Sequence, residues 1–225
     1  MLIRGLNTYN SYFRNSFRNA RNSVRKYATK NPNPPLQEGT NTKKAKVALI
    51  GARGYTGQNL ISLIDLHPYL EILHVLSREL NGQKLQGYNK DNIVYSNLQT
   101  EDIKKLEENG EVDVWVMALP NGVCKPFVDA IDSVEGGKSK IVDLSADYRF
   151  DTSGEWTYGL PELNDRRGIA GAKRISNPGG YAAAAQCAIA PPVEYATGTP
   201  TIFGFFSYSG AGTQPSPKHP LKFPE

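Results

Sequence analysis

The chain has 225 residues, of which 39% are hydrophobic and 21% charged, a composition typical of folded domains. No apolar run reaches the roughly 18–20 residues that a membrane-spanning helix needs, and no basic and aromatic stripe recurs, so we expect neither a membrane span nor nucleic-acid binding. The two cysteines and three histidines show no metal-ligand spacing, so we expect no metal.

The net charge of +4 is unevenly distributed, because residues 1–37 hold seven basic residues and no acid. Residues 1–30 combine this bias with an apolar stripe at helical spacing, which is typical of a mitochondrial targeting segment. The alternatives are a disordered basic tail or an interdomain linker. Residues 31–43 are rich in Pro and Asn and are interpreted as a linker. The predicted location is the mitochondrial matrix.

A glycine-rich turn follows the first predicted strand, at residues 46–50, and precedes an apolar helix. Strand, glycine turn and helix in this order are typical of a loop that binds the phosphates of a dinucleotide. A glycine-rich turn without a ligand is the alternative. The cofactor-binding candidates in the turn are Gly51, Arg53, Gly54, Tyr55, Thr56 and Gly57.

The second predicted strand, at residues 70–76, ends at Ser77 and Arg78. Enzymes that bind NAD place a carboxylate here against the ribose 2′-hydroxyl, whereas a hydroxyl and a guanidinium suit a 2′-phosphate. Glu79 follows and is expected to point elsewhere. The sequence therefore favours NADP as the cofactor.

Two further strands are predicted at residues 112–118 and 140–143. Ligands of open parallel sheets lie beyond the carboxyl ends of the strands, so Pro120, Asn121 and Ser145 are expected near the nicotinamide. Cys124 begins the helix expected from about residue 123 to 133. It is either an activated thiol or, as we favour, a small buried residue.

Six segments, in one order, closely resemble N-acetyl-γ-glutamyl-phosphate reductases, and the mitochondrial fungal form in particular, where the reductase follows an acetylglutamate kinase in a precursor. They are residues 51–57, 118–122, 143–149, 158–162, 176–179 and 209–212. The resemblance implies NADPH-dependent reduction of an acyl phosphate to a semialdehyde through a cysteine nucleophile. The family motif is Asn-Pro-Gly-Cys-Tyr, but Gly180 stands at the cysteine position here. Another cysteine, Cys187, lies seven residues further along the chain and is expected to be a buried thiol.

The resemblance also suggests residues that contact the substrate. Arg149 is expected either to bind a substrate carboxylate or phosphate or to form a surface ion pair. Tyr158 and Glu162 either shape the pocket wall or form a structural turn. Asn177 either orients the substrate or, as we favour, caps the following helix. His67, His74 and His219 are not expected to be catalytic.

The predicted fold class is α/β, with a Rossmann-like parallel sheet at residues 44–157 followed by an incomplete α+β catalytic or dimerisation domain at residues 158–225. The sequence predicts that this domain is truncated and that its final strand, at residues 201–208, leaves an apolar edge exposed. Three hypotheses follow: a reductase acting on an acyl phosphate, a catalytically inactive NADP(H)-binding remnant, or a partner of full-length reductase subunits. The expected protein partners are a second copy of the chain, in a homo-oligomer, or full-length reductase or kinase subunits.

Overall fold

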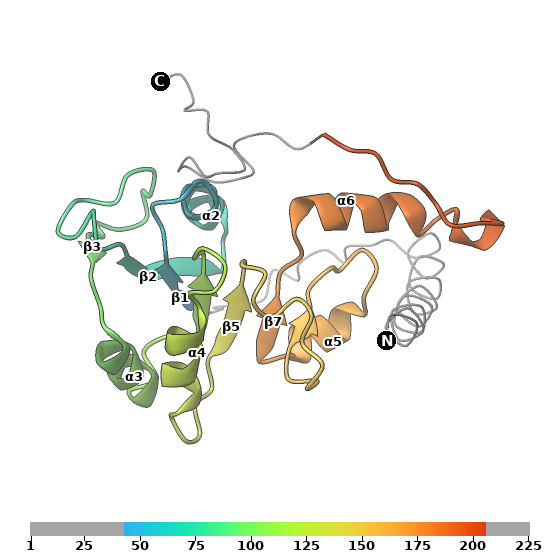
Figure 1. Ribbon diagram of the computed structural model, residues 1–225. Coiled ribbons are helices and arrows are strands. Elements are labelled where there is room, and N and C mark those ends of the chain that lie inside the picture. Colours follow the sequence, from blue (N-terminus) through green and yellow to red (C-terminus); the bar gives the residue numbers. More distant parts are fainter. Residues whose placement is uncertain (1–42, 206–225) are drawn as a thin grey trace.

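The computed structural model describes residues 43–205, which form one parallel sheet flanked by helices (Figure 1). The seven strands lie in the order β3-β2-β1-β4-β5-β7-β6. Every pair of neighbours is parallel. The strands are β1 (Ala45–Ile50), β2 (Leu70–Leu76), β3 (Tyr95–Ser96), β4 (Val114–Met117), β5 (Lys140–Asp143), β6 (Thr157–Tyr158) and β7 (Arg174–Ser176).

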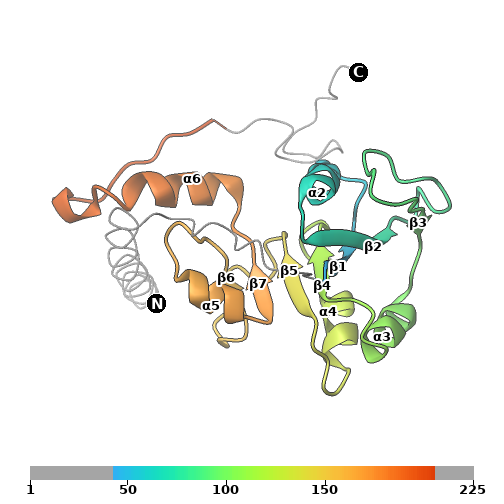
Figure 2. The ribbon, with the colours of Figure 1, turned by 180° about the vertical axis from the view of Figure 1, so that it is seen from behind.

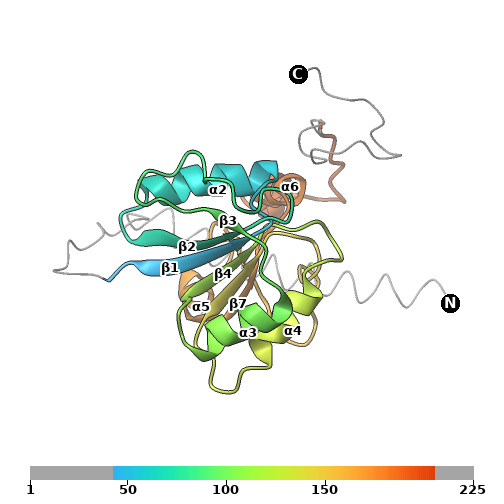
Figure 3. The ribbon, with the colours of Figure 1, turned by 90° about the vertical axis from the view of Figure 1, so that its left-hand side faces the viewer.

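Helices cover both faces of the sheet, with α2 on one face and α3 and α4 on the other (Figure 3). This arrangement buries both sides of the central strands, which explains their continuous apolar sequences. The helical elements are α2 (Tyr55–Leu66), α3 (Thr100–Glu108), α4 (Lys125–Asp132), α5 (Arg166–Gly171), α6 (Gly180–Ile189) and the short 3₁₀ turn η1 (Val193–Tyr195).

Strand β1 contributes to two hydrophobic cores because its side chains alternate between the faces of the sheet. Val47 and Leu49 pack in the core beneath α2. Ala48 and Ile50 pack with Trp115 in the core beneath α3 and α4. These residues are buried, so β1 is fixed at the centre of the fold. The loop that follows β1 therefore starts from a rigid support.

The strand order reverses between β1 and β4. From β1 the chain passes through α2 to β2 on one side, and after β3 and α3 it returns to pair β4 with the other side of β1. The loops after β1 and β4 consequently diverge, which leaves a crevice at the carboxyl ends of these strands. In open parallel sheets such a crevice is the usual ligand site.

The α/β fold and the parallel sheet predicted from the sequence are confirmed, including the strands at residues 70–76 and 140–143. The expected domain boundary after residue 157 falls inside β6, and the sheet continues to Ser176 (Figure 2). The sequence did not predict β6 and β7, because strands of two and three residues are too short to show a periodic pattern. The division into domains stays a prediction.

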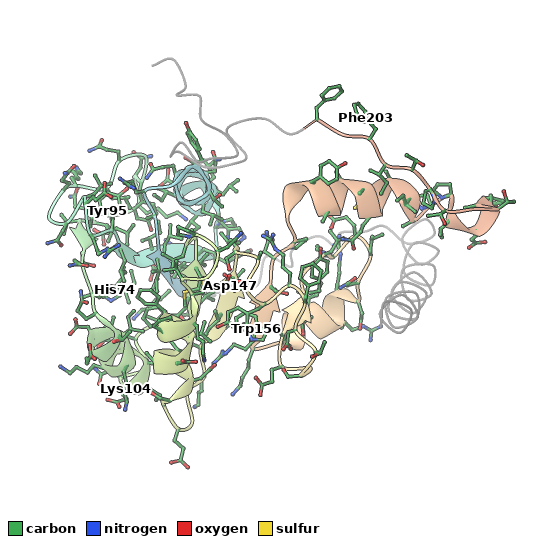
Figure 4. The ribbon with its side chains drawn as sticks, viewed as in Figure 1. His74, Tyr95, Lys104, Asp147, Trp156 and Phe203 are labelled. Atoms are coloured by element: carbon green, nitrogen blue, oxygen red, sulfur yellow. The ribbon has the colours of Figure 1, made fainter. Side chains whose placement is uncertain are left out.

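The strand predicted at residues 201–208 is wrong for its described part, because residues 201–205 have no regular structure. Ile202, Phe203 and Phe205 are exposed there, and Phe203 projects away from the sheet (Figure 4). An apolar β-branched run needs a neighbouring strand to become a strand itself, and none lies beside it in the described structure. The targeting segment, nearly all of the linker and the motif at residues 209–212 lie outside the described residues.

Candidate cofactor-binding site

A cavity of about 1320 Å³ lies at the carboxyl ends of the strands. Its walls come from the loops after β1, β2, β3, β4, β5 and β7, so almost the whole sheet contributes to it. The predicted residues that line it are Arg53, Gly51, Gly54, Tyr55, Thr56, Ser77, Arg78, Pro120, Asn121, Ser145, Arg149, Asn177 and Gly180. The fold therefore brings together most of the residues singled out from the sequence.

The turn after β1 requires glycine at position 51. Gly51 has a φ of +84°, and a Cβ there would lie 2.4 Å from the carbonyl oxygen of Ala118. Its N–H donates to the carbonyl of Leu76 at 3.2 Å. Without a side chain, the backbone passes between β2 and β4 and enters the cavity directly.

The N-terminus of α2 opens into this cavity. The N-cap is Gly54, no side chain caps the first N–H groups, and the first turn contains no acidic residue. A Cβ at Gly54 would meet no atom closer than 4.0 Å, whereas one at Gly57 would lie 2.6 Å from the Cα of Ala52. Gly57 thus packs the helix against the turn, and Gly54 leaves space in front of the helix N-terminus. This cradle fits an anion, since its N–H groups and the helix dipole favour negative charge.

The end of β2 forms the next part of the wall. The hydroxyl of Ser77 accepts the N–H of Leu80 at 3.3 Å, which fixes the turn that carries Arg78 and Glu79. Arg78 is exposed at the cavity. Arg53, from the glycine turn, forms an ion pair with Glu79. Glu79 therefore points at the cavity, contrary to expectation, because the basic side chain of the adjacent loop attracts it.

The loops after β4 and β5 are joined by hydrogen bonds. Asn121 Oδ1 accepts the N–H of Ala146 at 2.9 Å, and Asp147 accepts the N–H groups of Gly122 at 2.6 Å and Cys124 at 3.3 Å. Figure 4 shows Asp147 at the junction of these loops. The predicted Asn121 thus reaches the cavity wall with one end of its side chain already engaged.

The buried carboxylate of Asp143 organises the floor beneath these loops. It accepts both the N–H of Ser145, at 3.0 Å, and the Ser145 hydroxyl, at 2.8 Å. That hydroxyl also accepts the N–H of Asp147 at 3.1 Å. The Ser145 hydroxyl is therefore engaged as both donor and acceptor within the protein. Ser145 lines the cavity and holds the loop after β5 in place.

Cys124 is the small buried residue that the sequence analysis favoured. It is fully buried, and its thiol donates to Asp143 at 3.2 Å. Burial raises the pKa of this thiol to about 12, and the nearby carboxylates of Asp143 and Asp147 act in the same direction. A thiol with this pKa is protonated at neutral pH and is not a nucleophile.

Arg149 connects two loops at the opposite end of the cavity. Its Nε donates to the carbonyl of Asn177 at 2.8 Å, and its Nη2 donates to the carbonyl of Leu144 at 2.7 Å. Among residues 43–205 no carboxylate pairs with it, so a surface ion pair does not account for its position. A Cβ at Gly179 would lie 2.9 Å from Arg149 Nη1, so this glycine admits the guanidinium to the cavity.

The cap predicted for Asn177 is wrong. The N-cap of α6 is Gly179, no side chain caps the helix, and the Asn177 amide donates to the carbonyl of Pro178 at 3.1 Å. The chain needs two further residues, Pro178 and Gly179, to turn from β7 into the helix. A cap based on sequence spacing alone misses this geometry.

Gly180 is the first residue of α6 and lines the cavity. A Cβ there would meet no heavy atom within 4 Å, and the residue does not have a positive φ. A Cβ at this position is therefore accommodated sterically. Cys187 is half-buried and packs against a small cluster of Leu160, Leu163 and Ala190 away from the cavity.

Tyr158 and Glu162 do not line the cavity. The Tyr158 hydroxyl accepts the Gln186 amide at 3.0 Å, and its carbonyl accepts the Asn164 amide at 2.6 Å. Glu162 is exposed. The segment packs at the sheet edge beneath α6, which favours the structural turn.

Sequence reasoning missed the loop after β3, where residues 97–100 line the cavity. The only signal there is the capping box of α3, in which Gln99 and Asp102 exchange hydrogen bonds with the backbone. His67 and His74 do not line the cavity. Within residues 43–205 no three His, Cys, Asp or Glu residues gather in a way that could hold a metal, and no helix is long and apolar enough to cross a membrane.

The strand order, the glycine turn and the open helix N-terminus define a dinucleotide-binding Rossmann domain. Residues 46–172 match the sequence family described as semialdehyde dehydrogenase, NAD binding domain. This match covers more than half of the chain, and the chain therefore belongs to the semialdehyde dehydrogenase family.

The chain is also similar in sequence to curated proteins over most of its length. The protein ARG5,6, mitochondrial, of Candida albicans is 79% identical over 189 residues, which are 84% of this chain and 22% of that protein. An N-acetyl-gamma-glutamyl-phosphate reductase of Xanthomonas euvesicatoria is 47% identical over 176 residues, 77% of this chain and 53% of that protein. The chain thus spans about a fifth of the fungal relative and about half of the bacterial one.

Among solved structures, aspartate semialdehyde dehydrogenase II of Vibrio cholerae superposes with a TM-score of 0.55 at 17% identity. The superposition covers 68% of this chain and 43% of that one. At this identity the likeness concerns the fold alone, and it agrees with the parallel sheet described above.

Proposed function

We propose that the chain is the NADP(H)-binding part of an N-acetyl-γ-glutamyl-phosphate reductase, which forms N-acetylglutamate semialdehyde in arginine biosynthesis. The observation that carries the proposal is the uncapped N-terminus of α2, which opens through Gly51 and Gly54 into the cavity. Its N–H groups would hold the pyrophosphate. The names of the bacterial relatives supply the substrate.

The end of β2 supports NADP as the cofactor. Arg78 is exposed at the cavity, and no hydrogen bond or ion pair engages its guanidinium among the described residues. Arg53 lies on the neighbouring loop. Two guanidinium groups are suited to a 2′-phosphate, since Arg binds phosphate with charge-assisted hydrogen bonds.

The substrate would lie between the nicotinamide and the N-terminus of α6. Bound NADPH would supply a hydride there. Pro120, Asn121 and Ser145 would shape the nicotinamide end through the hydrogen-bonded loops after β4 and β5. Arg149 would offer Nη1 to the substrate phosphate or carboxylate, because its Nε and one N–H of Nη2 already bind the carbonyls of Asn177 and Leu144.

Gly180 favours a second candidate function, binding of NADP(H) without catalysis. The reaction implied by the family resemblance needs a thiol to take the acyl group and release phosphate, and glycine has none. Position 180 nevertheless lies at the N-terminus of a ten-residue helix. A thiol there would be stabilised as a thiolate by the helix dipole.

The names of the fungal relatives support a mitochondrial location, and we place the protein in the matrix. Association with full-length reductase subunits is the remaining partner hypothesis. Co-purification of the tagged chain with a full-length reductase from mitochondria tests both statements, and recovery in the cytosol would contradict the first.

NADPH binding is tested by fluorescence titration of the 225-residue chain, with a matched pair of variants. Both Asp and Asn are favoured N-caps, so Gly54→Asp and Gly54→Asn should preserve α2. Asp, unlike Asn, places a negative charge before the helix. We expect Gly54→Asp to abolish NADPH binding relative to Gly54→Asn. Binding by Gly54→Asp as tight as that of the unmodified chain would refute the phosphate site.

Catalysis is tested by adding the acyl phosphate to the NADPH complex and following absorbance at the nicotinamide band. We expect no oxidation by the chain with Gly180, whereas oxidation would remove the second candidate function. Gly180→Cys tests the thiol directly, because the structure has space for that side chain. Turnover by this variant would support the reductase assignment.

A further inference from the structure

Glu79 is a charged residue on the cavity wall to which the proposed function gives no role. Its carboxylate forms an ion pair with Arg53, so the loop after β2 is connected to the glycine turn after β1. Both side chains remain accessible to solvent, with exposed fractions of 64% for Glu79 and 43% for Arg53. Both residues line the cavity, and a ligand there can reach the pair.

The residues around the Arg53–Glu79 ion pair indicate which part of a bound dinucleotide would contact it. The turn that carries Arg78 and Glu79 is fixed by the hydrogen bond from the Leu80 N–H to the Ser77 hydroxyl. This corner of the cavity thus holds two guanidinium groups and one carboxylate. In a Rossmann domain the end of the second strand faces the adenosine ribose. A 2′-phosphate on that ribose would compete with Glu79 for Arg53.

We infer that Glu79 is a specificity-determining residue that lowers the preference of the site for NADP(H) over NAD(H). It does so by holding Arg53 in an ion pair that a 2′-phosphate must break. NAD(H) has a 2′-hydroxyl and leaves the pair intact. This inference rests on the proposed function, because it requires the adenosine ribose to lie at the end of β2.

The expected effect is modest because both partners are exposed. Ion pairs on a protein surface are weak, and their loss changes an equilibrium by about two- to fivefold. Replacing Glu79 by the neutral, similarly shaped Gln removes the ion pair, so Arg53 is available before the 2′-phosphate binds. We therefore expect Glu79→Gln to raise the affinity for NADPH relative to that for NADH by about two- to fivefold.

The experiment measures the dissociation constants of NADPH and NADH for the 225-residue chain and its variants by fluorescence titration. The matched control is Glu108→Gln, since Glu108 is an exposed glutamate that lies 4.0 Å from Lys104 on α3 and does not line the cavity. The control should leave both constants unchanged. An unchanged ratio of the two constants in Glu79→Gln would overturn the inference.

Arg53 distinguishes ion-pair exchange from simple repulsion between carboxylate and phosphate. Under exchange, Arg53→Gln weakens NADPH binding, and adding Glu79→Gln to that variant gives little gain because no pair is left to break. Under repulsion alone the gain would be at least as large without Arg53, and this result would refute the exchange. Failure of the unmodified chain to bind either nucleotide would instead refute the proposed function, and the inference with it.

Discussion

Substitution of Gly51 by Ala tests whether the glycine turn depends on close contact between β1 and β4. At a φ of +84° a side chain costs about 1–2 kcal/mol. The new Cβ would also lie 2.4 Å from the Ala118 carbonyl oxygen and 3.1 Å from Leu119. Forcing a methyl group into a packed site costs about 1–3 kcal/mol more. We expect the free energy of unfolding to fall by about 2–5 kcal/mol, which is a large part of the stability of a typical domain.

The control for this prediction is Gly110→Ala. Gly110 has a φ of +64°, but a Cβ there would meet nothing within 4 Å. It therefore measures the conformational cost alone. Urea unfolding of both variants, followed by circular dichroism, gives the two free energies. Equal losses in the two variants would refute the argument from close contact, because only Gly51 has a backbone neighbour in the way.

Two further predictions concern titratable groups. The pKa of His74 is lowered because the ring is partly buried, and its Nε2 has no hydrogen-bond partner among the described residues. Because the folded-state pKa lies below that of the unfolded chain, the unfolded chain takes up more protons at His74 as the pH falls from 7 to 5, so stability should fall over that range. His74→Gln should reduce that fall in urea unfolding, and an unchanged pH profile would contradict the assignment. For the thiols, a disulfide reagent at pH 8 should modify half-buried Cys187 before Cys124, whose pKa is raised to about 12. Cys187→Ser should abolish the fast phase, and a fast phase that survives would contradict the burial of Cys124.

The central part of the fold was predictable because its signals are local. A run of β-branched and aliphatic residues, a turn with glycine at positions 51, 54 and 57, and an apolar helix follow one another directly in the chain. Each element is specified by residues within a few positions of one another. The same holds for Ser77 and Arg78, which directly follow the second strand and do line the cavity.

The short strands β6 and β7 and several side-chain roles could not be predicted in this way. Strands β6 and β7 exist because β7 pairs with β5, a neighbour about thirty residues away in sequence. Tyr158, identified by a motif, lies on β6 at the sheet edge. Its side chain contacts α6 and does not line the cavity. These outcomes depend on partners that no local pattern reveals.

By itself the sequence determined the glycine turn after β1 and the start of α2, since backbone conformation at such a turn and at the start of a helix is decided by neighbouring residues. Only the tertiary structure decided which polar groups remain free for a ligand. It engages the Ser145 hydroxyl with Asp143, sets Glu79 against Arg53 and leaves Gly180 facing open space. The physical reason is that hydrogen bonds and ion pairs form between whichever groups the folded backbone brings within reach, whatever their separation along the chain.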